Sequence, residues 1–208
     1  MYTNKNQLRQ QQRGYSLVEL SIALAIIAVI IVGGLIGTRQ ILLTNSVNNQ
    51  LKESAQTITR ITKQFQRQTT TAGATTATLA PLGYWPSERV TNTGGVWTVR
   101  GAIGGSNEYV FTNDATVGTL RPNQALVYTI RNVPSAGCSD LANGLDSLAY
   151  TLYAGPAAAA APTAGATPPP GLTEIKAPDS DALSTDRLAT GCATTNPLVD
   201  VVAVIKVL

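Results

Sequence analysis

The stretch "QQRGYSLVELSIALAIIAVIIVGGLIG", from Gln11 to Gly37, decides the fold that we expect for this chain. No charged residue occurs from Leu20 to Thr38, a run of 19 positions. About 20 apolar residues of helix are enough to cross the hydrocarbon core of a bilayer. The run therefore predicts a membrane-spanning helix.

A single carboxylate, Glu19, lies immediately before this run. Ionisable side chains in membrane segments are costly, and for that reason they are functional candidates by default. Two interpretations are open at this point. Glu19 either marks the boundary between membrane and water, or it pairs with a positive charge.

The residues before the run are basic, with Lys5, Arg9 and Arg13 and no acid. Such a flank predicts a cytoplasmic N-terminus, with the rest of the chain outside. An ordinary secretory signal has a small-residue cleavage site after its apolar core. The segment "TRQILLTNSVNNQ" after this core has no A-x-A pattern, and the small residue Gly14 precedes the core instead.

The motif "RGYSLVEL" resembles the leader junction of the type IV prepilins. In that family a prepilin peptidase cuts after a glycine, the new N-terminal residue is methylated, and the fifth mature residue is a glutamate. The resemblance implies a leader of residues 1–14, cleavage between Gly14 and Tyr15, and Glu19 as the fifth residue. Tyr15 departs from the phenylalanine of the commonest subgroup. That departure and the longer leader both favour the type IVb pilins.

The resemblance also implies a role for Glu19. In related filaments the glutamate of one subunit neutralises the N-terminal amine of another, which here would belong to Tyr15. Two unit charges about 4 Å apart attract by about 4 kcal/mol at an effective dielectric near 20. Glu19 is thus an expected assembly residue and not a catalytic one.

Helical periodicity continues beyond Thr38. Apolar residues recur every three or four positions, at Ile41, Leu42, Val47, Leu51, Ala55, Ile58, Ile61 and Phe65. This pattern predicts one helix over residues 15–68, apolar all round in its first half and amphipathic in its second. Gly33, Gly34 and Gly37 interrupt the first half, which indicates either close helix packing or a stretch that can unwind.

The remainder of the chain predicts a sheet. Residues 69–95 are rich in Thr, Ala, Gly and Pro and are expected to form a connecting loop. Strand patterns follow in "GVWTVRGAI", "EYVFTN", "ALVYTIRNV", "LAYTLY" and "LVDVVAVIKVL", with a short helix in "VPSAGCSDLANGL". We expect an α+β fold, in which the long N-terminal helix packs on an antiparallel sheet domain of residues 96–208.

Cys138 and Cys192 are the two cysteines of the chain. Outside the membrane a disulfide is their expected state. It would close a loop of about 55 residues, which the chain-entropy model values at roughly 4 kcal/mol. The stretch "IRNVPSAGCSDLA" resembles the type IVb pilins a second time, because there too a strand leads through Asn-Val-Pro into a helix with the first cysteine. The second cysteine of that subgroup lies shortly before a terminal strand, as Cys192 does.

The sequence predicts no catalytic, cofactor or metal site, and thus no enzyme. The chain has no histidine, which removes most nucleophile–base pairs, and it has no P-loop or G-x-G-x-x-G motif. Asp179, Asp181 and Asp186 lack the spacing of a calcium loop, and we interpret them as solvated surface.

Charge gives no indication of a nucleic-acid partner. The net charge of +3 comes from the leader, which holds three of the 15 basic residues and none of the 12 acids. The remaining chain is neutral and has no basic stripe. The low-complexity segment from Ala154 to Gly171 is interpreted as a surface insertion, with a receptor-binding or glycan-bearing loop as the alternative.

We therefore expect the subunit of a type IVb-like pilus that serves adhesion, conjugation or motility. The resemblance implies copies of the same chain, prepilin peptidase, an inner-membrane platform and an assembly ATPase as partners. It also implies a single-pass inner-membrane protein before assembly and an extracellular filament afterwards. A minor pilin, a type II secretion pseudopilin, and a membrane-anchored periplasmic binding module that never assembles are the alternatives.

Overall fold

The computed structural model describes residues 16–104, 107–112, 119–121, 123–157 and 171–208. The chain forms two compact units, one up to Leu42 and one from Leu43 onward, which we describe separately. Gly14 and Tyr15, the expected processing site, lie outside the described residues, as do residues 158–170 of the expected insertion.

Helix α1 runs from Leu17 to Phe65, over 49 residues. The chain has no proline before Pro81, so nothing in this stretch removes a helical hydrogen bond. Glu19 lies in the first turn of α1 and Lys63 in the last, where each charge is favourable to the helix dipole. The long helix expected at residues 15–68 is confirmed, with ends that differ by a few residues.

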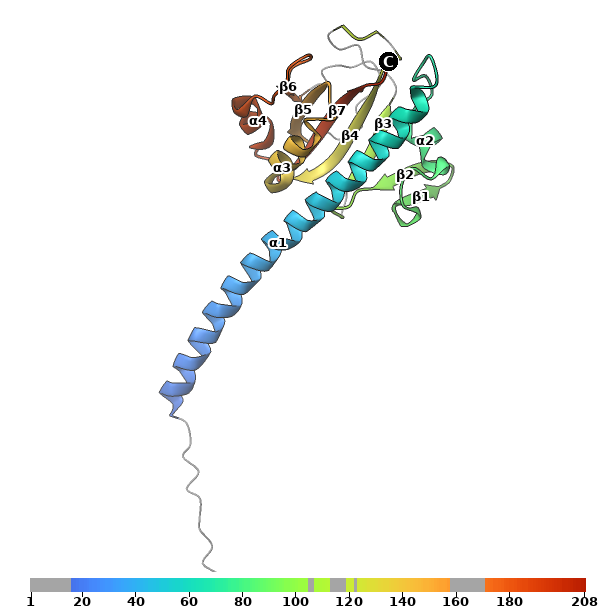
Figure 1. Cartoon of the computed structure of the whole chain (residues 1–208). Coiled ribbons are helices and arrows are strands. Elements are labelled where there is room, and N and C mark those ends of the chain that lie inside the picture. The colour runs from blue at the N-terminus through green and yellow to red at the C-terminus, as the bar shows by residue number, and fades with distance from the viewer. Residues whose placement is uncertain (1–15, 105–106, 113–118, 122, 158–170) are drawn as a thin grey trace, which may run out of the picture. The chain divides into compact units, whose positions relative to one another are not determined.

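The second unit contains a seven-stranded sheet with the order β1-β2-β3-β4-β7-β5-β6, in which all paired neighbours are antiparallel (Figure 1). Its strands are β1 Val90–Thr93, β2 Val96–Arg100, β3 Glu108–Thr112, β4 Ala125–Pro134, β5 Thr151–Pro156, β6 Thr173–Lys176 and β7 Leu198–Lys206. The helical segments are α2 Thr76–Leu79, η1 Ala80–Leu82, η2 Ser87–Arg89, α3 Ser135–Leu145 and α4 Thr185–Cys192. The expected α+β class is confirmed.

The segment 69–95, expected as a loop, contains α2, η1, η2 and β1. Thr75 begins α2 with a capping box, in which Thr75 and Thr78 bond each other's backbone N–H groups. Strand β1 forms because Gly94 and Gly95 both adopt positive φ, as a two-residue hairpin turn requires. Because the segment is polar and rich in Thr, Gly and Pro, its sequence pattern did not predict these short elements.

The beginning of the expected insertion also differs from its interpretation. Ala154, Gly155 and Pro156 complete β5 and pair with Val201, Asp200 and Val199 of β7. A Cβ atom at Gly155 would lie 2.9 Å from the carbonyl oxygen of Gly171, so a larger residue would force the chain apart there. The insertion thus begins after β5.

Both faces of the central strands are buried. Leu126, Tyr128 and Ile130 of β4 face a core cluster that includes side chains of α1 and α3. Val127, on the opposite face, belongs to a second cluster with Val202 of β7. The alternation follows from the period of two in a strand.

The buried face of α1 in the second unit consists of Val47, Gln50, Ser54, Thr57, Ile58, Ile61 and Phe65. This corrects the apolar stripe expected from the sequence. Ile41 and Leu42 are 63% and 61% exposed, and Leu51 and Ala55 are half-buried. The face includes three polar residues, because each of them hydrogen-bonds a group of the opposing elements.

Helix α3 approaches α1 closely through two glycines. A Cβ atom at Gly137 would lie 2.8 Å from Val47 Cγ2, and one at Gly144 would lie 2.4 Å from Leu51 Cδ2. The two glycines are seven residues apart and therefore share one face of α3. Their missing side chains let the Val47 and Leu51 side chains pack against the α3 backbone.

Candidate functional site

The first turn of α1 presents Glu19 to its surroundings. The Glu19 side chain is exposed, and no ion pair or hydrogen bond of its carboxylate occurs within the described residues. The nearby hydroxyl of Ser21 instead donates to the Val18 carbonyl, at 2.8 Å. The carboxylate is therefore available to a group outside these residues.

The charge-free run that follows Glu19 is exposed at every position whose side chain the structure describes. Mean hydropathy reaches 2.8 within α1, and among the described residues this is the one helix long and apolar enough to cross a membrane. The Thr38 hydroxyl bonds back to the carbonyl of Gly34, which satisfies its polar group within the helix. By length and composition this segment suits a bilayer or the apolar surface of another helix.

The three glycines of this segment have open space around them. A Cβ atom at Gly33, Gly34 or Gly37 would meet nothing within 4 Å. Intramolecular packing thus gives no reason for glycine at these positions. Close packing against another helix and a stretch that can unwind both stay predictions.

The second part of α1 is held to the sheet by an ionic network. Glu53 Oε1 lies 3.0 Å from Arg89 Nη2, and the Arg89 Nη1 group donates to the Gly101 carbonyl at 2.9 Å. The Tyr109 hydroxyl of β3 donates to Glu53 Oε2 at 3.3 Å. Burial raises the pKa of Tyr109, and the adjacent negative charge of Glu53 raises it further, so this hydroxyl stays a donor.

Two further polar residues of α1 contact the sheet domain. The hydroxyls of Ser54 and Tyr128 lie 2.9 Å apart in the core, and burial raises the pKa of Tyr128. Gln50 Oε1 accepts the backbone N–H of Ile103 at 3.1 Å. Because each bond requires one angular setting of the helix, these contacts fix which face of α1 meets the sheet.

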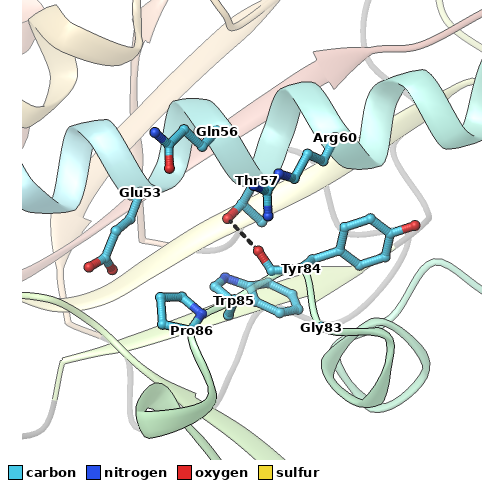
Figure 2. Close-up of a pocket in the computed structure, with 8 residues that line it drawn as sticks. All are labelled: Glu53, Gln56, Thr57, Arg60, Gly83, Tyr84, Trp85 and Pro86. Atoms are coloured by element: carbon cyan, nitrogen blue, oxygen red, sulfur yellow. Dashed lines mark hydrogen bonds between the residues drawn. The ribbon is translucent and has the colours of Figure 1, made fainter.

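A pocket of about 300 Å³ lies between α1 and the chain before η2 (Figure 2). It is lined by Glu53, Gln56, Thr57, Arg60, Gly83, Tyr84, Trp85 and Pro86. Thr57 Oγ1 donates to the Tyr84 carbonyl at 3.3 Å, and the buried Trp85 packs edge-on against Phe111 with ring centres 5.7 Å apart. The carboxylate of Glu53 is already bound by Arg89 and Tyr109, so the pocket wall serves to seat α1 and presents no free acid.

The disulfide between Cys138 and Cys192 is present and joins α3 to α4, with Cα atoms 5.6 Å apart. Its two ends lie 54 positions apart in the chain. The expected pairing is thus confirmed. The bond holds α4 against the same domain to which α3 and α1 contribute.

The three acids considered for a calcium loop have separate surroundings. Asp179 accepts a hydrogen bond from the Tyr150 hydroxyl at 2.9 Å. Asp181 and Asp186 are exposed. Across the part of the chain that the structure describes, no three potential ligands gather into a metal-binding group.

Comparison with known proteins bears on both units. Residues 9–35 match the family model of the prokaryotic N-terminal methylation motif, which includes Gly14, Tyr15 and Glu19. The chain resembles the crystal structure of a type IV b pilin from Salmonella typhi, with a TM-score of 0.51 and 15% identity over 75% of this chain and 97% of that one. This chain has a type IV pilin fold of the IVb kind.

A second pilin structure is similar to a lesser degree. TcpA, a type IV pilin from the Vibrio cholerae El Tor biotype, gives a TM-score of 0.47 and 14% identity over 77% of this chain and 98% of that one. No curated protein matches the chain. The pilin fold and the methylation motif together point to a structural subunit of the pilin or pseudopilin type.

The polar contacts of α1 were missed by the sequence reasoning. Gln50, Glu53 and Ser54 are polar residues within an amphipathic pattern, and nothing in the residue types distinguishes them from solvent-facing positions. The one available signal was their helical spacing, because Gln50 and Ser54 lie three and seven positions after Val47 and so share its side of the helix.

Proposed function

We propose that this chain is the structural subunit of a type IVb-like pilus. The observation that carries the proposal is the Glu19 carboxylate, which has no partner among the described residues and stands at the start of an exposed, charge-free helical run. The methylation motif over residues 9–35 and the pilin fold support it. In a binding module that never assembles, Glu19 would only mark the boundary between membrane and water and would not pair with another copy.

Processing is the first step of the proposal. Prepilin peptidase cuts between Gly14 and Tyr15, removes the basic leader and leaves a methylated amine on Tyr15. Before assembly the apolar part of α1 spans the inner membrane with its N-terminus in the cytoplasm. This amine then lies close to the edge of the hydrocarbon, where a charge needs a partner.

Assembly follows from pairing between copies. The Tyr15 amine of one subunit meets Glu19 of a neighbour, and the apolar runs of many copies bury one another in the filament core. At about 4 Å and an effective dielectric near 20 such a pair attracts by about 4 kcal/mol. The pair fixes the axial register between neighbouring helices, because the apolar side chains beside it provide no other specific contact. The inner-membrane platform and the assembly ATPase supply the force that extracts each subunit from the bilayer.

The test is the substitution Glu19→Gln, expressed with the wild-type assembly machinery. An uncompensated buried charge is destabilising by about 3–5 kcal/mol, so we expect filaments to be scarce. Processing and the fold of the second unit, which we call the head, should stay normal. The measurement is sheared surface filament relative to total processed protein, with N-terminal mass spectrometry to establish the start at Tyr15. Glu88→Gln, which removes an exposed acid of the second unit, is the matched control.

Three outcomes are informative. A normal filament yield from Glu19→Gln would contradict the proposed pairing. A chain that begins at Met1 would contradict the processing step. Wild-type protein present in filaments only in traces would identify a minor subunit or pseudopilin instead of the main one.

A further inference from the structure

The two sulfur atoms of the disulfide have unequal surroundings. Cys138 is 0% exposed and belongs to the main core cluster. Cys192 is partly exposed, at the last residue of α4. A molecule in solution therefore meets the Cys192 side of the bond first.

Cys192 also lines a groove of about 500 Å³ between α3 and α4. The other lining residues are Ser135, Ala136, Ser139, Thr185, Leu188, Ala189, Ala193 and Thr194. Most of these side chains are small, and none is charged. The groove therefore has room for an extended peptide segment that passes over Cys192.

Helix polarity adds a second asymmetry. Cys138 is the fourth residue of α3, whose 11 residues make it long enough for a substantial dipole. A thiolate is stabilised at a helix N-terminus, although burial in an apolar core opposes this effect. Cys192 ends α4, where the dipole disfavours negative charge. Cys138 is consequently the better leaving group of the two with respect to helix polarity.

We propose that thiol–disulfide exchange enters this bond at Cys192, and that the groove seats the cysteine-bearing segment of a thiol–disulfide oxidoreductase. The thiolate of the partner attacks Cys192 Sγ, the bond between Cys192 and Cys138 breaks, and Cys138 leaves as a thiolate that then takes up a proton. The step forms one mixed disulfide and consumes one disulfide, so it needs no further oxidant or reductant.

The same route serves formation of the bond. In the reverse direction the reduced chain holds a mixed disulfide to the oxidoreductase at Cys192. The Cys138 thiolate at the α3 N-terminus then displaces the partner thiol and closes the bond. Cys138 is thus the resolving residue, and Cys192 is the residue that meets the partner.

The test uses the full-length wild-type protein in detergent, with glutathione as the attacking thiol. Exchange is stopped by acid, free thiols are alkylated in denaturant, and peptides are mapped by mass spectrometry. We expect glutathione on Cys192 to exceed glutathione on Cys138 by roughly tenfold, because attack depends on access and on the leaving thiol. The unfolded chain, treated in the same way, should carry glutathione on both residues.

A variant that fills the groove tests whether access to Cys192 passes through it. Ala189 lies in the groove and is exposed, so Ala189→Trp should cover Cys192 without disturbing the core. We expect it to slow native-state exchange by roughly tenfold, whereas Ala77→Trp on the exposed surface of α2 should leave the rate unchanged. Circular dichroism establishes that both variants are folded.

Four results would overturn the proposal. These are a preference for Cys138, equal labelling of both residues in the folded protein, an exchange rate that Ala189→Trp leaves unchanged, and no adduct under conditions in which the unfolded chain reacts. The second and third results together would show that exchange proceeds only through global unfolding.

Discussion

The two parts of α1 use the same backbone for opposite purposes. From Leu17 to Leu42 every described side chain is exposed, although most of them are apolar. From Leu43 to Phe65 one face is buried, and several of its residues are polar. Hydrophobicity alone would assign the first part to a protein core and the second part to a surface.

The difference shows what specifies a contact in each part. The second part meets a defined partner in its own chain, so Ser54 and Gln50 can each be matched to one hydrogen-bonding group. In the first part every described side chain is exposed, and the run from Leu20 to Thr38 carries no charge. Whatever packs against this run can recognise only its shape and apolarity, with Glu19 and Arg39 as the charges at its two ends.

The largest expected effect comes from truncating a buried apolar side chain in the second part of α1. Ile61 is 0% exposed, so Ile61→Ala should destabilise the head by about 2–5 kcal/mol. Ile30 is 67% exposed, and Ile30→Ala should change head stability by less than about 0.5 kcal/mol. Denaturant unfolding followed by tryptophan fluorescence measures both. Equal effects would contradict the division of α1 into two parts.

A charge placed in the first part of α1 tests the proposal that this part spans a bilayer. Ile30 lies near the centre of the uncharged run, so Ile30→Arg should disfavour membrane insertion by about 2.5–3.5 kcal/mol. Head stability should stay unchanged. Carbonate extraction of membranes measures the integrated fraction, with Thr59→Arg on the exposed face of the second part as the control. Full insertion of Ile30→Arg would show that the run does not need a hydrocarbon environment.

The buried hydroxyl pair tests whether polar contacts position the second part. Ser54→Ala or Tyr128→Phe leaves the other hydroxyl unsatisfied in the core, at an expected loss of about 1–3 kcal/mol each. The double variant removes both hydroxyls and should lose less than the sum of the single losses. Strict additivity in unfolding experiments would mean that the two groups are not coupled.

The smallest expected effect is a loss of unfolding free energy at alkaline pH, caused by two buried tyrosines of the same region. Burial raises the pKa values of Tyr109 and Tyr128 above the unfolded value near 10. Their contribution is complete below about pH 10 and is lost as the pH rises further, because the unfolded chain releases these protons first. Between pH 10 and 11 we expect a fall of about 1 kcal/mol for each tyrosine, because the unfolded hydroxyl is already about half ionised at pH 10. The slope of unfolding free energy between pH 10 and 11 should decrease in Tyr109→Phe.

Much of this architecture could be predicted from local pattern. The uncharged run of α1, the β-branched and aromatic residues of β4, and the continuous apolar stretch of β7 are local features, and each predicts its element without knowledge of the fold. Strands β1 and β6 and helix α4 were missed, because they are short and their sequences are polar. Their order comes from pairing and from the disulfide, which sequence periodicity does not contain.

The residues of the candidate site also differ in whether the sequence alone can single them out. Glu19 is recognisable because a charge beside an apolar run is unusual wherever it occurs. Glu53 and Arg89 are 36 positions apart, and neither stands out from other surface charges in the sequence. The turn at Gly83 and the short helix η2 bring them together, and that geometry depends on the packing of Trp85 beneath α1.

The two outer strands of the sheet have a consequence for crowding. Strand β1 has four residues of mostly polar character, and β6 has four residues that include Glu174, which pairs with Arg187 at 2.8 Å. Short, charged or polar edges are poor templates for pairing with another sheet. Many copies of this head can therefore stand next to one another at very high local concentration and still resist fusion into amyloid-like sheets.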